Sequence, residues 1–236
     1  VEGGYLTQPR WSVTLRKGKL KGRLIRVYTS EELQEMTDEQ INQAIITDLF
    51  EDAYATQKKE RVAFKGKNLA LGLESAIFVC PKCGEIGKLH SENNRFYCEC
   101  GFDSVYDVYG ELTDSQGNKY TVTELDTNQK EILKKKFQTC SDDELLFEDY
   151  IDAHDINEKH ELVSKKSCMI KAYKNHLECG DNRLEFNDVE GMAIYSRSAL
   201  IIHQKNQAGH LEMKSDNISF NALKYLYLYE RIKHQG

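Results

Sequence analysis

Short runs of alternating apolar and polar residues fill the last third of the chain, with turn-forming residues between them. Alternation with a period of two places every second side chain on one face of a strand, so each run predicts a strand. The six runs follow directly on one another and predict an antiparallel meander: residues 168–173, 176–180, 183–188, 191–196, 199–204 and 210–215. From about Ser219 the spacing becomes helical, with a predicted buried side of Leu223, Leu226, Tyr227 and Ile232.

The first half of the chain predicts both kinds of element. Residues 5–28 alternate apolar with basic positions, which favours one or two strands. Thr29 and Glu32 form a capping-box pattern, and so do Thr37 and Gln40. Apolar residues at helical spacing follow Thr37, and they predict an amphipathic helix of about four turns. Further predicted elements are helices over 126–138 and 142–152 and a turn at Gln116–Gly117–Asn118.

Together these patterns predict an α+β protein, and its 236 residues are enough for several small segments. Residues 1–76 hold the predicted strands and amphipathic helix, and residues 77–125 hold a cysteine-bearing ribbon with a following hairpin. Residues 126–160 form an acidic, helical linker. Residues 161–236 form the antiparallel β domain with its terminal helix.

Charge is distributed unevenly along the chain, whose formal net charge is −6. Residues 10–26 carry basic side chains and no acid, so Arg10, Arg16, Lys17 and Lys19 are candidate contacts to phosphate or to an anionic membrane surface. The alternative is an ordinary solvated strand pair. The overall acidity makes nucleic acid an unlikely partner, and no apolar run is long enough to span a membrane.

Four of the seven cysteines have the spacing of metal ligands: Cys80-x2-Cys83 and Cys98-x-Cys100. Two thiolate pairs carried on tight turns suit a tetrahedral Zn²⁺ site, although the second pair is one residue shorter than usual. Disulfides are the main alternative, and a four-thiolate iron site also fits the spacing. Because four protein ligands would fill the coordination sphere, we expect Zn²⁺ here to be structural rather than catalytic.

The remaining cysteines and histidines give weaker signals. Cys140, Cys168 and Cys179 lack metal-ligand spacing, and we interpret them as packed free thiols. His176 and Asp181 match the His-x4-Asp spacing with which glycerolipid acyltransferases position a general base and its orienting carboxylate. Here the pair runs from a predicted strand into a turn, so we interpret it as part of a surface hairpin.

A longer pattern covers the first hundred residues. The run "YLTQPRWSVTLRKGK" is followed by "EELQEMT", by the predicted amphipathic helix and by "GLESAIFVCPKCG". This succession resembles the carboxyl-terminal part of Firmicutes-type 1-acyl-glycerol-3-phosphate acyltransferases, closely over roughly residues 3–101 and more loosely beyond them. The resemblance rests on many positions in order rather than on one short motif.

The resemblance implies an enzyme that transfers an acyl chain from acyl-CoA or acyl carrier protein to lysophosphatidate in phospholipid synthesis. The family's His-x4-Asp pair and its Pro-Glu-Gly segment precede the matched region, and neither has a counterpart in this chain. We therefore expect an inactive fragment that consists of an incomplete acyltransferase-domain tail, a zinc ribbon and a β meander. The start at Val1 without methionine agrees with this expectation, and no signal peptide is recognisable, so we expect a cytoplasmic protein with peripheral contact at the inner face of the plasma membrane.

The predicted meander and terminal helix are similar in outline to pleckstrin-homology-like modules, in which a helix closes one end of a bent sheet. That similarity implies docking on lipid or on a partner protein. The alternative function is a zinc-ribbon module that binds protein or nucleic acid without catalysis. The excess of acidic residues argues against nucleic acid.

Overall fold

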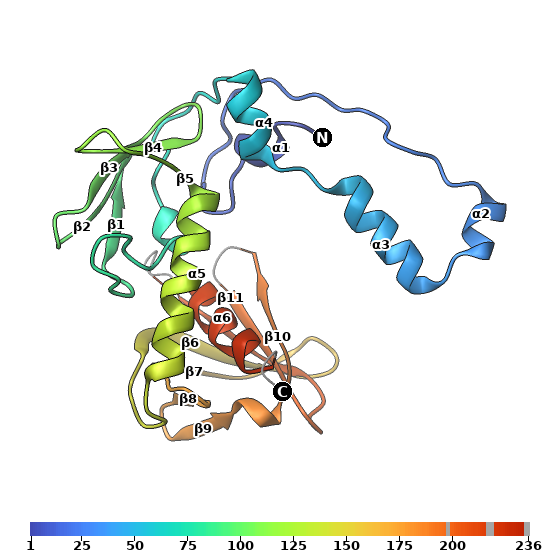
Figure 1. The fold of residues 1–236 in the computed structure, drawn as a ribbon. Coiled ribbons are helices and arrows are strands. Elements are labelled where there is room, and N and C mark those ends of the chain that lie inside the picture. Colours follow the sequence, from blue (N-terminus) through green and yellow to red (C-terminus); the bar gives the residue numbers. More distant parts are fainter. Residues whose placement is uncertain (197–198, 216–219, 234–236) are drawn as a thin grey trace.

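The computed structural model describes residues 1–196, 199–215 and 220–233, and it confirms the α+β class (Figure 1). The helices are α1 (Gly4–Thr7), α2 (Ser30–Glu35), α3 (Asp38–Leu49), α4 (Ala53–Glu60), α5 (Val122–Thr139) and α6 (Ala222–Lys233), with 3₁₀ turns at η1 (Leu73–Ser75) and η2 (Phe186–Asp188). The strands of a first sheet are β1 (Leu89–Glu92), β2 (Arg95–Cys98), β3 (Asp103–Tyr106), β4 (Glu111–Asp114) and β5 (Lys119–Thr121). A second sheet contains β6 (Phe147–Ile156), β7 (Leu162–Ala172), β8 (His176–Cys179), β9 (Asn182–Glu185), β10 (Val189–Tyr195), β11 (Ala199–Gln204) and β12 (His210–Lys214).

The first sheet is a five-stranded antiparallel meander in sequence order, β1 to β5. The predicted turn at residues 116–118 joins β4 to β5. Gly117 adopts a φ of 86° there, and the Asp114 carboxylate accepts hydrogen bonds from the backbone N–H groups of Gln116 and Asn118. This side-chain bonding holds the turn without help from the rest of the protein.

The second sheet has seven strands in the order β10-β11-β12-β6-β7-β8-β9, so all six predicted strands are present and a seventh, β6, joins the two halves. The prediction of a helix over 142–152 is wrong because these residues lead into β6. Phe147 and Ile151, four positions apart, are both buried. A spacing of four keeps two residues on one face of a strand as well as of a helix, so it could not separate the two structures.

Helix α6 packs against the second sheet, and its most buried residues are Ala222, Lys224, Tyr225, Leu228 and Tyr229. The predicted buried side is therefore displaced: Leu223, Leu226 and Tyr227 are only half-buried, and the side chain of Ile232 lies outside the described residues. The helix has neighbours on more than one side. The Tyr225 ring packs edge-on against Phe147 of the sheet at 5.0 Å, and the Tyr227 hydroxyl donates to Asp126 of α5.

Two hydrophobic cores share helix α5. Val122 and Leu125 belong to a core with the amino-terminal segment and the ribbon, whereas Leu133 and Phe137 belong to a core with the second sheet and α6. Between them lies Gln129, whose side chain is buried in the apolar stripe of the helix. Its amide nitrogen donates to the Ala76 carbonyl and its amide oxygen accepts from the Phe78 N–H.

The prediction of strands over residues 5–28 is wrong. The structure places α1 and extended chain there, with only isolated bridges from Glu2 to Lys21 and from Lys17 to Lys65. The alternation does not mark one buried face. Trp11 and Arg16 are buried against the first core, while the apolar residues Leu15, Leu20 and Leu24 are exposed.

Residues 20–50, here called the arm, extend away from the two cores and carry α2 and α3 (Figure 1). Both helices begin with the capping boxes that the sequence predicts, at Thr29 and Thr37. The Tyr28 hydroxyl donates to Asp48 at 2.6 Å and joins the outgoing chain to α3. The exposed large apolar residues of the arm are Leu20, Leu24, Ile25, Val27, Leu33, Ile45, Ile46, Leu49 and Phe50.

Replacing Gln129 tests the link between the two cores. We expect Gln129→Ala to lower the free energy of unfolding by about 3 kcal/mol, because it leaves two buried backbone groups without partners. Urea titration followed by circular dichroism measures this change. Asn128→Ala, on the exposed face of the same helix, should change the value by less than about 0.5 kcal/mol. Equal stability of the two variants would contradict the role of Gln129.

Candidate metal centre

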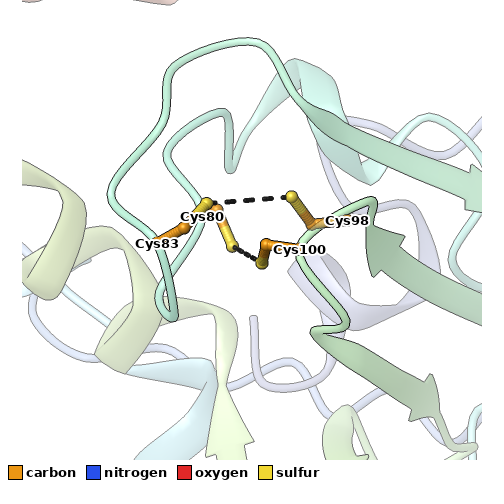
Figure 2. A group of neighbouring side chains, drawn as sticks. All are labelled: Cys80, Cys83, Cys98 and Cys100. Carbon is orange, nitrogen blue, oxygen red and sulfur yellow. Dashed lines mark hydrogen bonds between the residues drawn. The ribbon is translucent and has the colours of Figure 1, made fainter.

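The four predicted ligands are brought together by two tight turns. Cys80 and Cys83 lie in the turn enclosed by the isolated bridge between Val79 and Ile86. Cys98 ends β2, and Cys100 lies in the turn that leads to β3. The two turns face each other, and Figure 2 shows the four side chains directed toward one centre.

The backbone of each turn is closed by one hydrogen bond and a glycine. The Gly84 N–H donates to the Cys80 carbonyl, and Gly84 adopts a φ of 74°. In the second turn the Gly101 N–H donates to the Cys98 carbonyl, with φ at 87°. The second bond spans one residue fewer, which accommodates the shorter Cys-x-Cys spacing. Both positions need the left-handed conformation that glycine adopts without steric cost.

The sulfur positions fit a tetrahedral ion. All four Sγ atoms lie within 4.8 Å of one another, with Cys80 to Cys100 at 3.6 Å and Cys83 to Cys98 at 3.9 Å. Metal–sulfur bonds of about 2.3 Å in a tetrahedron require sulfurs roughly 3.8 Å apart. The site is therefore compatible with a metal held by four thiolates.

The environment of the thiols is asymmetric. Cys80 and Cys98 are buried, and burial raises the pKa of both thiols above the usual value, strongly for Cys80. Cys100 is exposed, and a hydrogen bond from the Phe102 N–H lowers its pKa to about 7. An ion at this centre would favour the deprotonated form of all four groups, because a metal displaces the thiol protons.

The predicted basic contacts of residues 10–26 differ in how far they are exposed to solvent. Arg16 is 4% exposed, with its guanidinium 5.6 Å from the Trp11 ring centre and 5.0 Å from that of Tyr106. Its Nη2 donates to the Leu69 carbonyl at 2.7 Å. The prediction of Arg16 as a phosphate or membrane contact is therefore wrong, because the side chain is enclosed in the first core. Lys17 and Lys19 are exposed.

Arg10 lines a cavity beside α5 and remains a candidate anion contact. No local sequence pattern indicates this cavity, because its walls come from segments that are far apart in the chain. Gln129 was also missed, although a detectable signal existed. It is a polar residue at a position of the apolar stripe defined by Leu125 and Leu133.

His176 and Asp181 do not form a catalytic pair. His176 is buried and its ring stacks on Tyr173 at 4.5 Å, while its Nε2 lies 3.7 Å from a Glu178 carboxylate oxygen. Asp181 is fully exposed in the turn after β8, 3.9 Å from the Lys166 ammonium. The hairpin predicted here is present, but its histidine belongs to the interior of the protein.

Two of the remaining cysteines differ from the prediction. Cys168 of β7 and Cys179 of β8 are joined in a disulfide, so their interpretation as free thiols is corrected. Because β7 and β8 are neighbouring strands, side chains eleven positions apart come together across the hairpin. Cys140 is a buried free thiol, as predicted.

Comparison with known proteins leaves the family open. The chain matches no protein-family model, and no curated protein sequence is significantly similar to it. Among the described residues, no helix is both long enough and apolar enough to cross a bilayer.

Arg16 should contribute to stability rather than to binding. We expect Arg16→Ala to lower the free energy of unfolding by about 3 kcal/mol, since it removes a charged hydrogen-bond donor and two cation–π contacts. Lys17→Ala, at the neighbouring exposed position, is the matched control, and its effect should stay within about 0.5 kcal/mol. Denaturant unfolding measures both variants. If Arg16→Ala left the free energy of unfolding unchanged, the stabilising role of Arg16 would be contradicted.

Proposed function

We propose that Cys80, Cys83, Cys98 and Cys100 bind one structural Zn²⁺. The sulfur separations support this metal because they match the edges of a Zn–S₄ tetrahedron. Four protein ligands leave no coordination position for water or substrate. The ion would therefore cross-link two turns and would not act as a Lewis acid.

The position of the site supports the same role. Cys80 and Cys98 contribute to the first hydrophobic core beside Leu89, Phe96 and Phe102. A metal at this point would stabilise a small core that is built largely from turns and short strands. Small cores of this kind gain much of their stability from such cross-links.

Metal analysis tests the proposed ion. The purified chain should contain about one Zn²⁺, and its removal by a chelator should lower the unfolding midpoint, because metal-binding energy is folding energy. Cys98→Ala should lose the metal, whereas Cys140→Ala, in the other core, should retain it. A full complement of iron, or a metal-free chain with an unchanged midpoint, would contradict the proposal.

We further propose that the chain is the carboxyl-terminal portion of a glycerolipid acyltransferase. In this proposal the complete enzyme transfers an acyl group from acyl-CoA or acyl carrier protein to lysophosphatidate. The matched pattern supports it as a structural signature: Trp11 of "PRW" and Leu73 of "GLE" are buried in one core with the first metal ligand, Cys80. Arg16 of "RKGK" stacks on that Trp11.

The uncovered arm is the observation that carries the acyltransferase proposal. The resemblance assigns these residues to the last strands and helix of an acyltransferase domain. In the described chain their apolar side chains are exposed, up to 81% for Leu24 and 76% for Leu49 and Phe50. Large apolar side chains exposed in this number favour an interaction surface, as expected of an element that packs against further parts of a domain.

The described chain would then have no catalytic role of its own. The general base and the phosphate-binding segment would lie outside it, and the ribbon would hold the β domain to the end of the enzyme. Lys17 and Lys19 are the exposed cations available for peripheral contact with an anionic membrane.

Sequencing the genomic region upstream of Val1 tests the acyltransferase proposal. We expect an in-frame His-x4-Asp followed by Pro-Glu-Gly. The longer product should transfer acyl groups to lysophosphatidate in a purified assay, the present chain should not, and alanine at the upstream histidine should abolish the activity. An in-frame stop codon followed by a ribosome-binding site directly before Val1 would refute the proposal and favour a stand-alone ribbon module.

A further inference from the structure

A cavity of about 440 Å³ lies where five separate segments of the chain meet. Its walls come from the amino-terminal segment, the α3–α4 junction, residues 76–77, the first turns of α5 and the helix α6. The volume falls in the range of small-molecule sites. Aromatic rings are prominent in the wall: Tyr5, Phe50, Tyr54 and Tyr227.

The acidic side chains of the wall already have partners. Glu51 accepts a hydrogen bond from the Gly3 N–H. Asp52 caps α4 by accepting from the backbone N–H groups of its first turn. Asp126 is paired with the Lys130 ammonium at 2.7 Å and accepts from the Tyr227 hydroxyl at 3.0 Å. Of these carboxylates, Asp126 has a cationic partner, whereas Glu51 and Asp52 accept hydrogen bonds from backbone N–H groups.

Arg10 is a cation of the wall that lacks a partner among the described residues. Within the described parts of the chain, its guanidinium makes no ion pair or hydrogen bond, and its Nε is buried without an acceptor. A buried donor without an acceptor is unfavourable, and an oxygen anion in the cavity would supply the missing acceptor. The geometry therefore presents one free cation next to several aromatic surfaces.

We infer that this cavity binds a small organic oxyanion, a carboxylate or a phosphate monoester, carried on a flat aromatic body. Arg10 pairs with the oxyanion, and the aromatic body packs against the rings of Tyr5 and Tyr227. An inorganic anion is disfavoured because it would leave the apolar wall uncovered beside three carboxylates. The inference uses only the cavity and does not depend on the acyltransferase proposal.

The Tyr5 hydroxyl supports an anionic ligand. Burial raises the pKa of Tyr5 to about 12, with a smaller opposing effect from the Arg10 charge. Like an ordinary tyrosine, Tyr5 is protonated at neutral pH and can donate a hydrogen bond. The Tyr5 ring is held edge-on to Trp11 at 6.4 Å and to Tyr54 at 6.1 Å, so its position is set before any ligand arrives.

Isothermal titration calorimetry of the full chain with defined probes tests this inference. 2-Naphthoate and 2-naphthyl phosphate should each bind at about one per chain if the head group is any oxyanion. Binding of only one of them would identify the source of the oxyanion. 2-Naphthol, 2-naphthylmethylammonium and inorganic phosphate should bind at least tenfold more weakly.

Three variants locate the binding. Arg10→Leu should weaken binding of the oxyanion probes at least tenfold, since it removes a charge-assisted hydrogen bond. Thr123→Trp, an exposed wall position of α5, should block the cavity without disturbing a core. Arg23→Leu, an exposed cation outside the wall that pairs with Glu2, should bind like the unmodified chain. The inference fails if neither oxyanion binds, if naphthol or inorganic phosphate binds as tightly, or if Arg10→Leu or Thr123→Trp binds normally.

Discussion

The backbone of residues 76–78 passes from one hydrophobic core to the other, and its polar groups must find partners at a point where water is excluded. Gln129 satisfies two of them, the Ala76 carbonyl and the Phe78 N–H, from the centre of α5. Because the first metal ligand follows at Cys80, the same contact fixes where the cysteine-bearing turn begins. Asn221 adds a second link by donating to the Glu74 carbonyl at the start of α6. The relative placement of ribbon, helix and sheet thus depends on two buried amide side chains.

The first core depends on polar cross-links to an unusual degree. Arg16 lies between two aromatic rings at one end, and the cysteine cluster closes the ribbon at the other. Short strands and turns bury little apolar surface per residue, so hydrophobic burial alone stabilises such a unit weakly. Arg16 joins segments that are distant in sequence, and a metal at the cysteine cluster would do the same. Such connections would take the place of the packing contacts that a larger core provides.

Local signals made much of this structure predictable. The cysteine spacing, the capping boxes at Thr29 and Thr37 and the turn at residues 116–118 are each decided by a few neighbouring residues, and all are present. Features decided by distant partners were missed. From the sequence alone Arg16 is predicted to be a surface cation, because its burial depends on contacts with Trp11 and Tyr106. Cys168 and Cys179 come together only because β7 and β8 pair in the sheet. The cavity at Arg10 is of the same kind, since no single segment contains its wall.

In the arm, capping boxes define where the helices begin but do not by themselves make the helices stable. Capping boxes start α2 and α3, but α3 has only 12 residues, a length at which an isolated helix is marginal in water. Its apolar residues Ile45, Ile46 and Leu49 are exposed, so packing adds little to its stability in the described chain. The helix therefore needs a covering surface. Both arm helices have acidic residues in the first turn and contain no basic residue. An anionic bilayer would therefore repel these helices. Charge thus favours protein over lipid as the cover for the helices.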